Sequence, residues 1–94
     1  MAKTHPFIHQ KTATATATQV VRANKDRIAL LIYNNEVANY VEIVTKQNAK
    51  YGQGLPIAPK SNYENEHYCQ GEYWVICDTG LTADVRIEED LKTG

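Results

Sequence analysis

The hydrophobic pattern along the chain is that of short β-strands separated by turns. The most apolar segment, residues 27–34, reads RIALLIYN. Both of its alternating faces are apolar, which predicts a central strand covered on both sides. Residues 83–89 alternate strictly, and this alternation predicts a final strand with Ala83, Val85 and Ile87 turned inward.

Two further strands are expected at residues 40–45 and 73–77, which are rich in Val, Ile and aromatic residues. The segment 46–60 between them contains two glycines and two prolines, so it is expected to be a long loop. Its residues 55–58 can form a short extended piece, but Pro56 and Pro59 exclude a central strand there. The polar residues around Tyr63 predict an edge strand. The acidic run at residues 88–90 is expected to be a solubilising terminus.

No segment repeats apolar residues at the spacing of an amphipathic helix, apart from one turn at the C-terminus. Several short strands punctuated by turns predict an all-β fold, a small antiparallel β-sandwich with jelly-roll-like or barrel-like closure. Residues 1–11 show no period and are expected to form a tail. The predicted organisation is an extended N-terminal arm at residues 1–18 followed by a β-sandwich domain at residues 19–94.

Thr and Ala alternate strictly from Thr12 to Thr18. An extended chain would place the threonines on one side, where the arm could pair with a strand edge of a neighbouring subunit. Valines follow directly and would anchor the arm in the domain. The predicted oligomer or capsid interface comprises Thr12, Thr14, Thr16, Thr18, Val20, Val21 and Arg22. The alternative is a disordered leader that ends at Gln19.

The composition fits a small β-domain that gains stability from association. The chain has 94 residues, with seven Ile and seven Val but one Phe and one Trp. β-Branched side chains suit pleated sheets, and a domain of this size is only marginally stable alone. Oligomerisation is therefore expected. The longest apolar run is six residues, and the N-terminus lacks a signal-peptide core, so synthesis and retention in the cytosol are expected.

Charge is distributed unevenly along the chain. The net charge is −1, which argues against a dedicated nucleic-acid binder. Residues 1–27 hold five basic residues against one acidic residue, and residues 61–94 hold eight acidic residues against two basic ones. A basic front and an acidic back can attract each other between copies, or dock on a charged partner. Alternatively, both are simply solvated.

The sequence holds no recognisable catalytic constellation. It lacks a phosphate-binding glycine loop, and the single serine, Ser61, is not part of a nucleophile motif. No enzymatic activity and no cofactor are expected.

The strand between Cys69 and Cys77 separates them too far for a disulfide, so two buried thiols are expected. Copies of His5 or His9 gathered around an oligomer axis could capture a metal ion.

The tyrosines and Trp74 are expected to pack in the core or at an interface. A carbohydrate-binding face made from them is the alternative.

Several segments together are similar to a known family. The chain carries, in order, VVRANKDRIALLIYNN, YVEIV, GLPIAP, SNYENE, GEYWVICDTG and ADVRIEE. This order resembles small virion structural proteins of tailed bacteriophages, of the capsid decoration or cement type, over residues 19–89. One departure is Lys60, which stands where such loops usually carry glycine. It leaves the shape of that turn open.

The resemblance implies a β-sandwich that binds the outside of the assembled phage head and stabilises it. Its expected partners are the major capsid protein and further copies of itself, as a homo-oligomer that in such proteins is often a homotrimer. It implies no enzymatic activity, no membrane partner and no direct contact with nucleic acid. The expected location is the outer surface of the virion, after synthesis in the host cytoplasm. Alternatives are a tail or neck component, or a small module that binds carbohydrate or a host surface.

Overall fold

The computed structural model describes residues 3–93, with side chains from residue 7 to residue 92. This part of the chain forms strands and no helix, so it holds no helix that could cross a membrane. The strands are β1 (Lys3–Ala13), β2 (Thr18–Val21), β3 (Arg27–Asn34), β4 (Val41–Val44), β5 (Leu55–Ile57), β6 (Asn62–Asn65), β7 (Tyr73–Ile76) and β8 (Ala83–Thr93).

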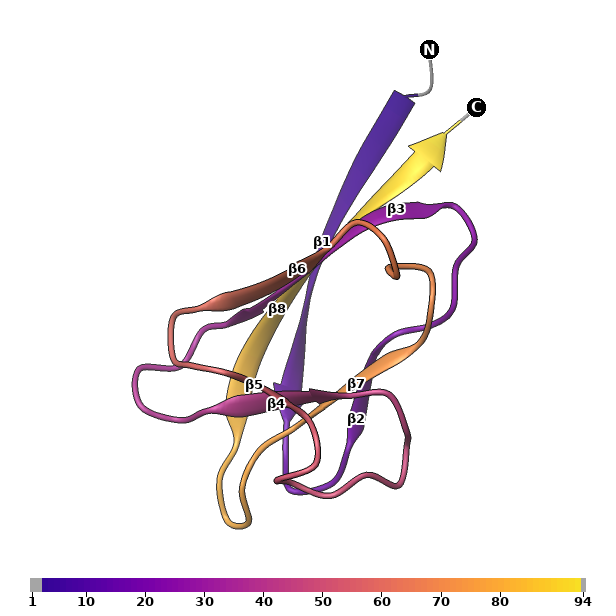
Figure 1. Cartoon of the computed structure of the whole chain (residues 1–94). Coiled ribbons are helices and arrows are strands. Elements are labelled where there is room, and N and C mark those ends of the chain that lie inside the picture. The colour runs from indigo at the N-terminus through magenta and orange to yellow at the C-terminus, as the bar shows by residue number, and fades with distance from the viewer. Residues whose placement is uncertain (1–2, 94) are drawn as a thin grey trace.

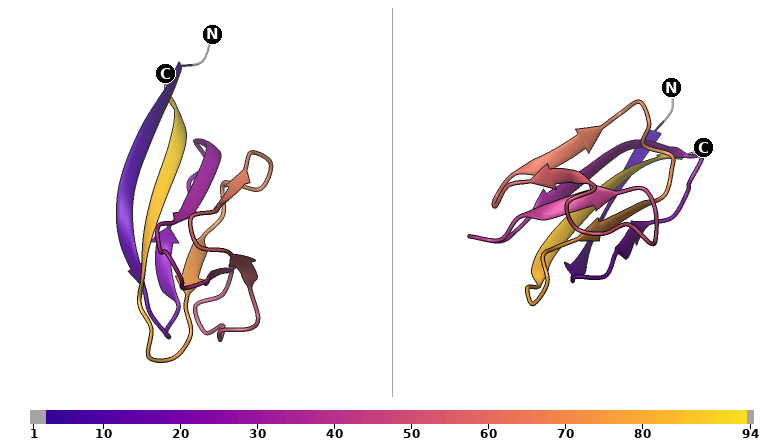
Figure 2. Two further views of the ribbon diagram at one scale, coloured as in Figure 1. Left: turned by 90° about the vertical axis from the view of Figure 1, so that its left-hand side faces the viewer. Right: turned by 60° about the horizontal axis from the view of Figure 1, so that its bottom comes forward.

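The strands form two four-stranded antiparallel sheets that pack as a sandwich (Figures 1 and 2). The first sheet has the order β1-β8-β3-β6 and the second the order β2-β7-β4-β5. The first strand pairs with the last, the second with the seventh, the third with the sixth and the fourth with the fifth. This order is that of a long hairpin rolled up on itself, the jelly roll. The predicted antiparallel β-sandwich is confirmed, and its closure is of the jelly-roll kind.

The core lies between the two sheets and consists largely of β-branched side chains. In β8 the expected inward set is confirmed, because Ala83, Val85 and Ile87 are all buried. The other buried apolar side chains are Ala13, Val20, Val21, Leu30, Ile32, Val41, Ile43, Val44, Ile57, Cys69, Tyr73, Val75, Ile76 and Cys77. Valine and isoleucine stiffen at χ1 and fit the pleated inner faces, which is why this composition yields a sandwich.

Strand β3 lies in the interior of the first sheet, between β8 and β6, but it is covered on one face only. Leu30 and Ile32 are buried, whereas Leu31 and Tyr33 are half-buried and Ile28 is 39% exposed. The prediction that both faces are covered is wrong for this chain. The second sheet packs on the inner face, and no element among residues 3–93 covers the outer one.

The expectation of an unpatterned tail at residues 1–11 is also wrong. Residues 3–13 form β1, which pairs antiparallel with β8 from Lys3 opposite Thr93 to Ala13 opposite Ala83. The two strands reach beyond the body of the sandwich and bring the two ends of the chain together (Figure 1). Sequence pattern could not reveal β1, because its pairing depends on residues about eighty positions away, and its side chains from Phe7 to Thr12 are mostly exposed.

The acidic run at residues 88–90 is not a frayed terminus, which corrects a further expectation. It lies inside β8, which continues to Thr93. Glu88 and Asp90 lie on the outer face, and Glu89 is turned inward towards Arg27. Alternation in a strand sends neighbouring side chains to opposite faces, so these three residues serve two different surfaces.

The Thr-Ala repeat is a corner and not one extended strand, which corrects the expected arm. Thr12 ends β1 with Ala13, residues 14–17 turn, and Thr18 begins β2 in the second sheet. The Thr14 hydroxyl accepts a hydrogen bond from the N–H of Thr16 at 3.2 Å. The Cys77 N–H donates to the Thr14 carbonyl at 2.9 Å and ties the corner to the core. Short threonine side chains that bond to nearby backbone favour such turns over continued pairing.

Lys60 adopts the left-handed conformation that glycine usually occupies, with φ at 60°. Its N–H donates to the Asn34 carbonyl at 2.9 Å, and its ammonium group donates to the side-chain oxygen of Asn35 at 3.0 Å. The sequence left the shape of this turn open, because Lys60 stands where glycine is usual. In the structure the turn keeps the backbone conformation of glycine. These contacts offset the steric strain of a side chain at positive φ.

Candidate functional site

A buried arginine links four segments at one end of the sandwich. Arg27 is 1% exposed, and its guanidinium donates to the Glu89 carboxylate at 2.9 Å. It also donates to the carbonyl oxygens of Cys69, Gly71 and Arg22 at 2.6, 3.1 and 2.5 Å. All the donor groups of the fork are thereby used, so Arg27 is a structural tie and not a free binding group.

Glu89 connects this tie to the first strand. Its second carboxylate oxygen lies 2.9 Å from Nε2 of His9, whose side chain is 32% exposed. The charge of Glu89 is balanced by the buried guanidinium of Arg27, 2.8 Å away. The sequence suggested other roles for these two residues: Glu89 as part of a solubilising terminus, and His9 as a metal ligand. Nothing in the local sequence pattern indicates that they meet.

Above this tie, a cavity of about 590 Å³ opens between β1 and the segment that begins with β2. His9 and Lys11 line it from β1, and Gln19 and Arg22 line it from the other side, with Arg27 and Glu89 also at its wall. Lys11 and Arg22 are both exposed. Their charges have no ion-pair partner among the described side chains. We call this the basic cleft.

A second hollow lies on the outer face of the first sheet. It has a volume of about 170 Å³ and is lined by backbone or side-chain atoms of β3, β6 and β8. Four acidic residues surround it, and the residues of β3 that form its floor are apolar. The lining residues are Ala29, Leu30, Leu31, Glu64, Asn65, Glu66, Glu88 and Asp90. We call this the acidic groove.

Strand β1 forms an open edge of the first sheet. On the β3 side of β8, the N–H of Lys92 donates to the Asp26 carbonyl oxygen at 2.7 Å, and the Asp84 carbonyl oxygen accepts from the N–H of Asn35 at 3.0 Å. Backbone groups alternate along a strand, so odd-numbered residues of β8 face β1. Pro6 pairs with Asp90, so its nitrogen points to the open edge, where a missing N–H breaks no ladder bond. Ile8, two residues further, is 74% exposed on that edge strand.

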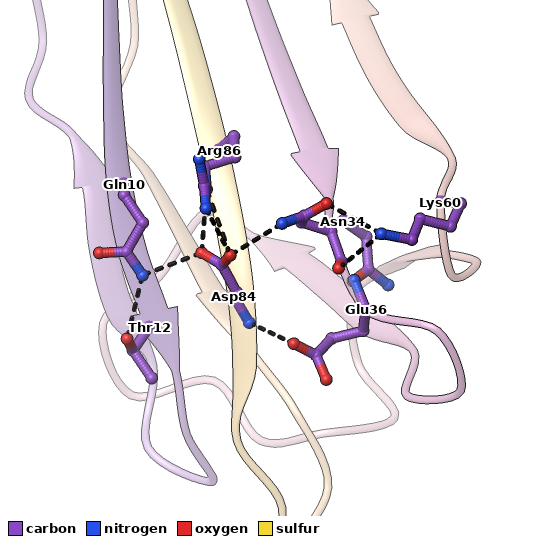
Figure 3. Close-up of polar contacts among 8 residues, drawn as sticks. Gln10, Thr12, Asn34, Glu36, Lys60, Asp84 and Arg86 are labelled. Atoms are coloured by element: carbon purple, nitrogen blue, oxygen red, sulfur yellow. Dashed lines mark hydrogen bonds and ion pairs between the residues drawn. The ribbon is translucent and has the colours of Figure 1, made fainter.

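Further along the ribbon, a polar cluster covers the outer face of β1 and β8 (Figure 3). Asp84 accepts hydrogen bonds from Arg86 at 2.9 Å, from Asn35 at 2.9 Å and from Gln10 at 3.0 Å. These bonds, with Arg86 first, hold the pKa of Asp84 well below its usual range. Lys60 extends the cluster through Asn35. Through the bond between Gln10 and Asp84, the cluster links β1 to β8.

The predicted interface residues do not form one surface. Thr12 lies in β1, Thr14 and Thr16 in the corner, and Thr18 in β2, where its hydroxyl donates to the Thr16 carbonyl at 3.2 Å. Val20 and Val21 are 3% and 4% exposed, which suits an anchoring role but removes both from the surface. Arg22 is exposed at the rim of the basic cleft.

The side chain of His5 lies outside the described side chains, so the metal hypothesis can be placed only at His9, which pairs with Glu89. Among the described residues, no group of three or more His, Cys, Asp or Glu is arranged to hold a metal ion.

Trp74 is half-buried, and Tyr63 packs against Tyr73 with ring centroids 6.4 Å apart. These three aromatic side chains are packing residues.

The two cysteines are free thiols, and both are buried. Cys69 lies 3.3 Å from the Arg27 carbonyl oxygen, to which its thiol donates. Cys77 lies 3.1 Å from the Leu81 carbonyl oxygen and contacts Ala13 in the same way. Burial, followed by the nearby charge of Asp78, raises the pKa of the Cys77 thiol. A protonated, buried thiol is a poor nucleophile, so Cys77 is placed as a packing residue.

Comparison with known proteins gives a fold neighbour. No protein-family model matches the chain, and no curated protein does. A chain of a solved structure of Bacillus endospore appendages, which form a novel family of disulfide-linked pili, is similar in structure with a TM-score of 0.59. The match covers 99% of this chain and 89% of that chain at 15% sequence identity. This likeness supports the β-sandwich fold.

Proposed function

We propose that this protein is a structural protein that works as a homo-oligomer on the outside of a bacteriophage head, as a decoration protein. One observation carries the proposal. Strands β1 and β8 pair as a long two-stranded ribbon whose end reaches beyond the sandwich (Figure 1). Where β8 also pairs with β3, β1 is the open edge of the sheet and exposes Phe7 by 49% and Ile8 by 74%. Exposed apolar side chains on a strand edge favour contact with another protein.

The mechanism is thermodynamic. A protein that binds the assembled shell but not free capsid subunits stabilises the shell by mass action. An oligomer that engages several capsid subunits at once adds avidity without any new kind of contact. The ribbon supplies an extended, rigid element for this contact, because β1 is held along its whole length by β8. The resemblance of residues 19–89 to phage decoration proteins supports the same function.

The experiment adds purified protein to mature heads that lack it, and measures bound copies and the temperature at which the heads release DNA. We expect saturable binding to assembled heads, none to free capsid protein, and a higher release temperature. Ile8→Glu places a charge on the exposed edge and is expected to weaken head binding at least tenfold. Val37→Glu is the matched control, since Val37 is 84% exposed and lies outside the ribbon. Unchanged binding by Ile8→Glu, or equal loss with the control, would contradict the proposal.

A second candidate, a subunit of a filament, is favoured by the pilus chain that shares this fold. That protein is described as disulfide-linked, whereas both cysteines of this chain are buried. A filament of this chain would therefore be held by non-covalent contacts. Electron microscopy of the concentrated protein separates the two candidates, since a decoration protein gives closed oligomers of one size and a filament subunit gives open polymers.

A further inference from the structure

The proposed function requires that copies of the chain recognise each other, and the structure offers two surfaces of opposite charge for this purpose. We propose that the copies associate head to tail, with the basic cleft of one copy against the acidic groove of the next. The inference rests on the proposed function, because it names the contact by which the homo-oligomer forms. It requires no partner other than a second copy of this chain.

The basic cleft carries unbalanced positive charge. Lys11 stands on one lip and Arg22 on the other, and neither side chain has an ion-pair partner among the described residues. The Arg27–Glu89 pair at the wall is close to neutral as a unit, with N–O distances of 2.8 to 2.9 Å. The two exposed cations therefore determine the charge of the cleft. An approaching surface that supplies carboxylates between the lips would pair with both.

The acidic groove carries unbalanced negative charge. Glu64 and Glu66 lie at the β6 side, and Glu88 and Asp90 lie at the β8 side. None of these four carboxylates has a salt-bridge partner within the described part of the chain. Of the other acids, Glu89 pairs with Arg27 and Asp84 with Arg86. The groove thus gathers four carboxylates without a salt-bridge partner, with the half-exposed apolar face of β3 between them.

Their positions in the fold exclude a contact within one molecule. The cleft is lined by inward residues of the first sheet, such as Glu89, whereas the groove lies on the outer face of the same sheet, so the two surfaces point in opposite directions. A two-fold contact of either surface with its own copy would bring like charges together, which is unfavourable. A contact between two different surfaces is heterologous, and it closes into a ring, such as a trimer, or continues as a filament.

The charged character of the contact predicts a strong dependence on salt. Interactions between exposed charges are screened over about 8 to 10 Å at 0.10 to 0.15 M ionic strength and over about 3 Å at 1 M. Self-association measured by light scattering or analytical ultracentrifugation is therefore expected to weaken at least tenfold between low salt and 1 M salt. Association that is unchanged or stronger at 1 M salt would overturn the head-to-tail contact.

Two double variants test the surfaces separately. Lys11→Gln with Arg22→Gln removes the cations of the cleft, and Glu64→Gln with Glu66→Gln removes two acids of the groove. All four side chains are exposed, so the fold should be kept, as thermal melts can verify. Each double variant is expected to lose self-association at least tenfold. A third variant, Lys46→Gln with Lys50→Gln, changes charge equally on the exposed loop after β4 and should assemble like the parent chain.

A mixture provides the decisive measurement. The cleft variant retains a working groove and the groove variant retains a working cleft, so an equal mixture is expected to form dimers of one copy each and nothing larger. Failure of the mixture to pair, or self-association unchanged in either double variant, would overturn the inference. If the protein still forms oligomers after all these substitutions, the contact between copies is a different one, and the proposed function is not affected. The proposed function itself is decided separately, by binding of the parent chain to heads.

Discussion

Glu42 shapes the loop that follows β4. Its side chain is 7% exposed, and its carboxylate accepts hydrogen bonds from the N–H groups of Gly52 and Gly54 at 2.7 and 3.1 Å. A methyl group at Gly54 would meet the carbonyl oxygen of Ile43 and come within 2.7 Å of a methyl carbon of Val44. One buried carboxylate and one glycine without space for a side chain therefore determine the path of this loop.

We expect Gly54→Ala to lower the free energy of unfolding by about 2 kcal/mol or more, because the new methyl group must displace backbone in a packed region. The control is Gly71→Ala, where an added methyl group would meet nothing within 4 Å. That control should change the free energy of unfolding by less than about 1 kcal/mol. Urea denaturation monitored by Trp74 fluorescence measures both. Equal effects of the two substitutions would show that the close approach of backbone to Gly54 does not determine stability.

Asp84 makes stability depend on pH in the acid range. Hydrogen bonds from Arg86, Asn35 and Gln10 lower its pKa in the folded chain relative to the unfolded chain. A lowered pKa stabilises the fold above the unfolded value, about 3.9 for Asp, and this contribution is lost as the pH falls through that value towards the folded one. We expect Asp84→Asn to be less stable than the parent chain at pH 7, with a smaller difference at pH 3. Denaturation curves that stay equally far apart at both pH values would contradict this.

At the scale of strands, Arg27 joins elements that hydrophobic packing alone does not hold. It begins β3, and its guanidinium reaches β8 at Glu89, the loop after β2 at the carbonyl of Arg22, and the loop before β7 at the carbonyl of Cys69. Its hydrogen bonds therefore connect strands of the first sheet to the loops that flank β2 and β7 of the second sheet. A buried charge with all its donors used is strongly coupled to every element it touches.

Arg27→Lys is expected to lower the free energy of unfolding by about 3 kcal/mol, since an ammonium group has three donors and cannot reproduce the planar fork. Arg22→Lys is the matched control. The Arg22 side chain is exposed and only its carbonyl oxygen contacts Arg27, so this change should leave stability within about 0.5 kcal/mol of the parent chain. If Arg27→Lys were as mild as the control, the hydrogen bonds of the fork would contribute little.

For the molecule as a whole, the jelly-roll wrapping brings both ends of the chain together at the tip of the ribbon and buries both thiols. We expect assembly to be unaffected by reducing agents, because neither Cys69 nor Cys77 is accessible for an intermolecular disulfide. In the folded chain, both thiols should react with a thiol-labelling reagent at least a hundredfold more slowly than in urea. Loss of oligomers or filaments on reduction would contradict this expectation.

The sequence by itself determined the all-β class, most strand positions and the inward face of β8, because alternation and β-branched composition are local signals. It also predicted the edge character of β5 and β6 from Pro56 and from the polar residues around Tyr63. Tertiary structure decided the rest. Strand β1 exists because β8 lies opposite it, the Thr-Ala repeat is a corner because the chain passes there from one sheet to the other, and Glu89 meets Arg27 and His9 only through the roll. These contacts join residues up to about ninety positions apart, and no local pattern encodes such distances.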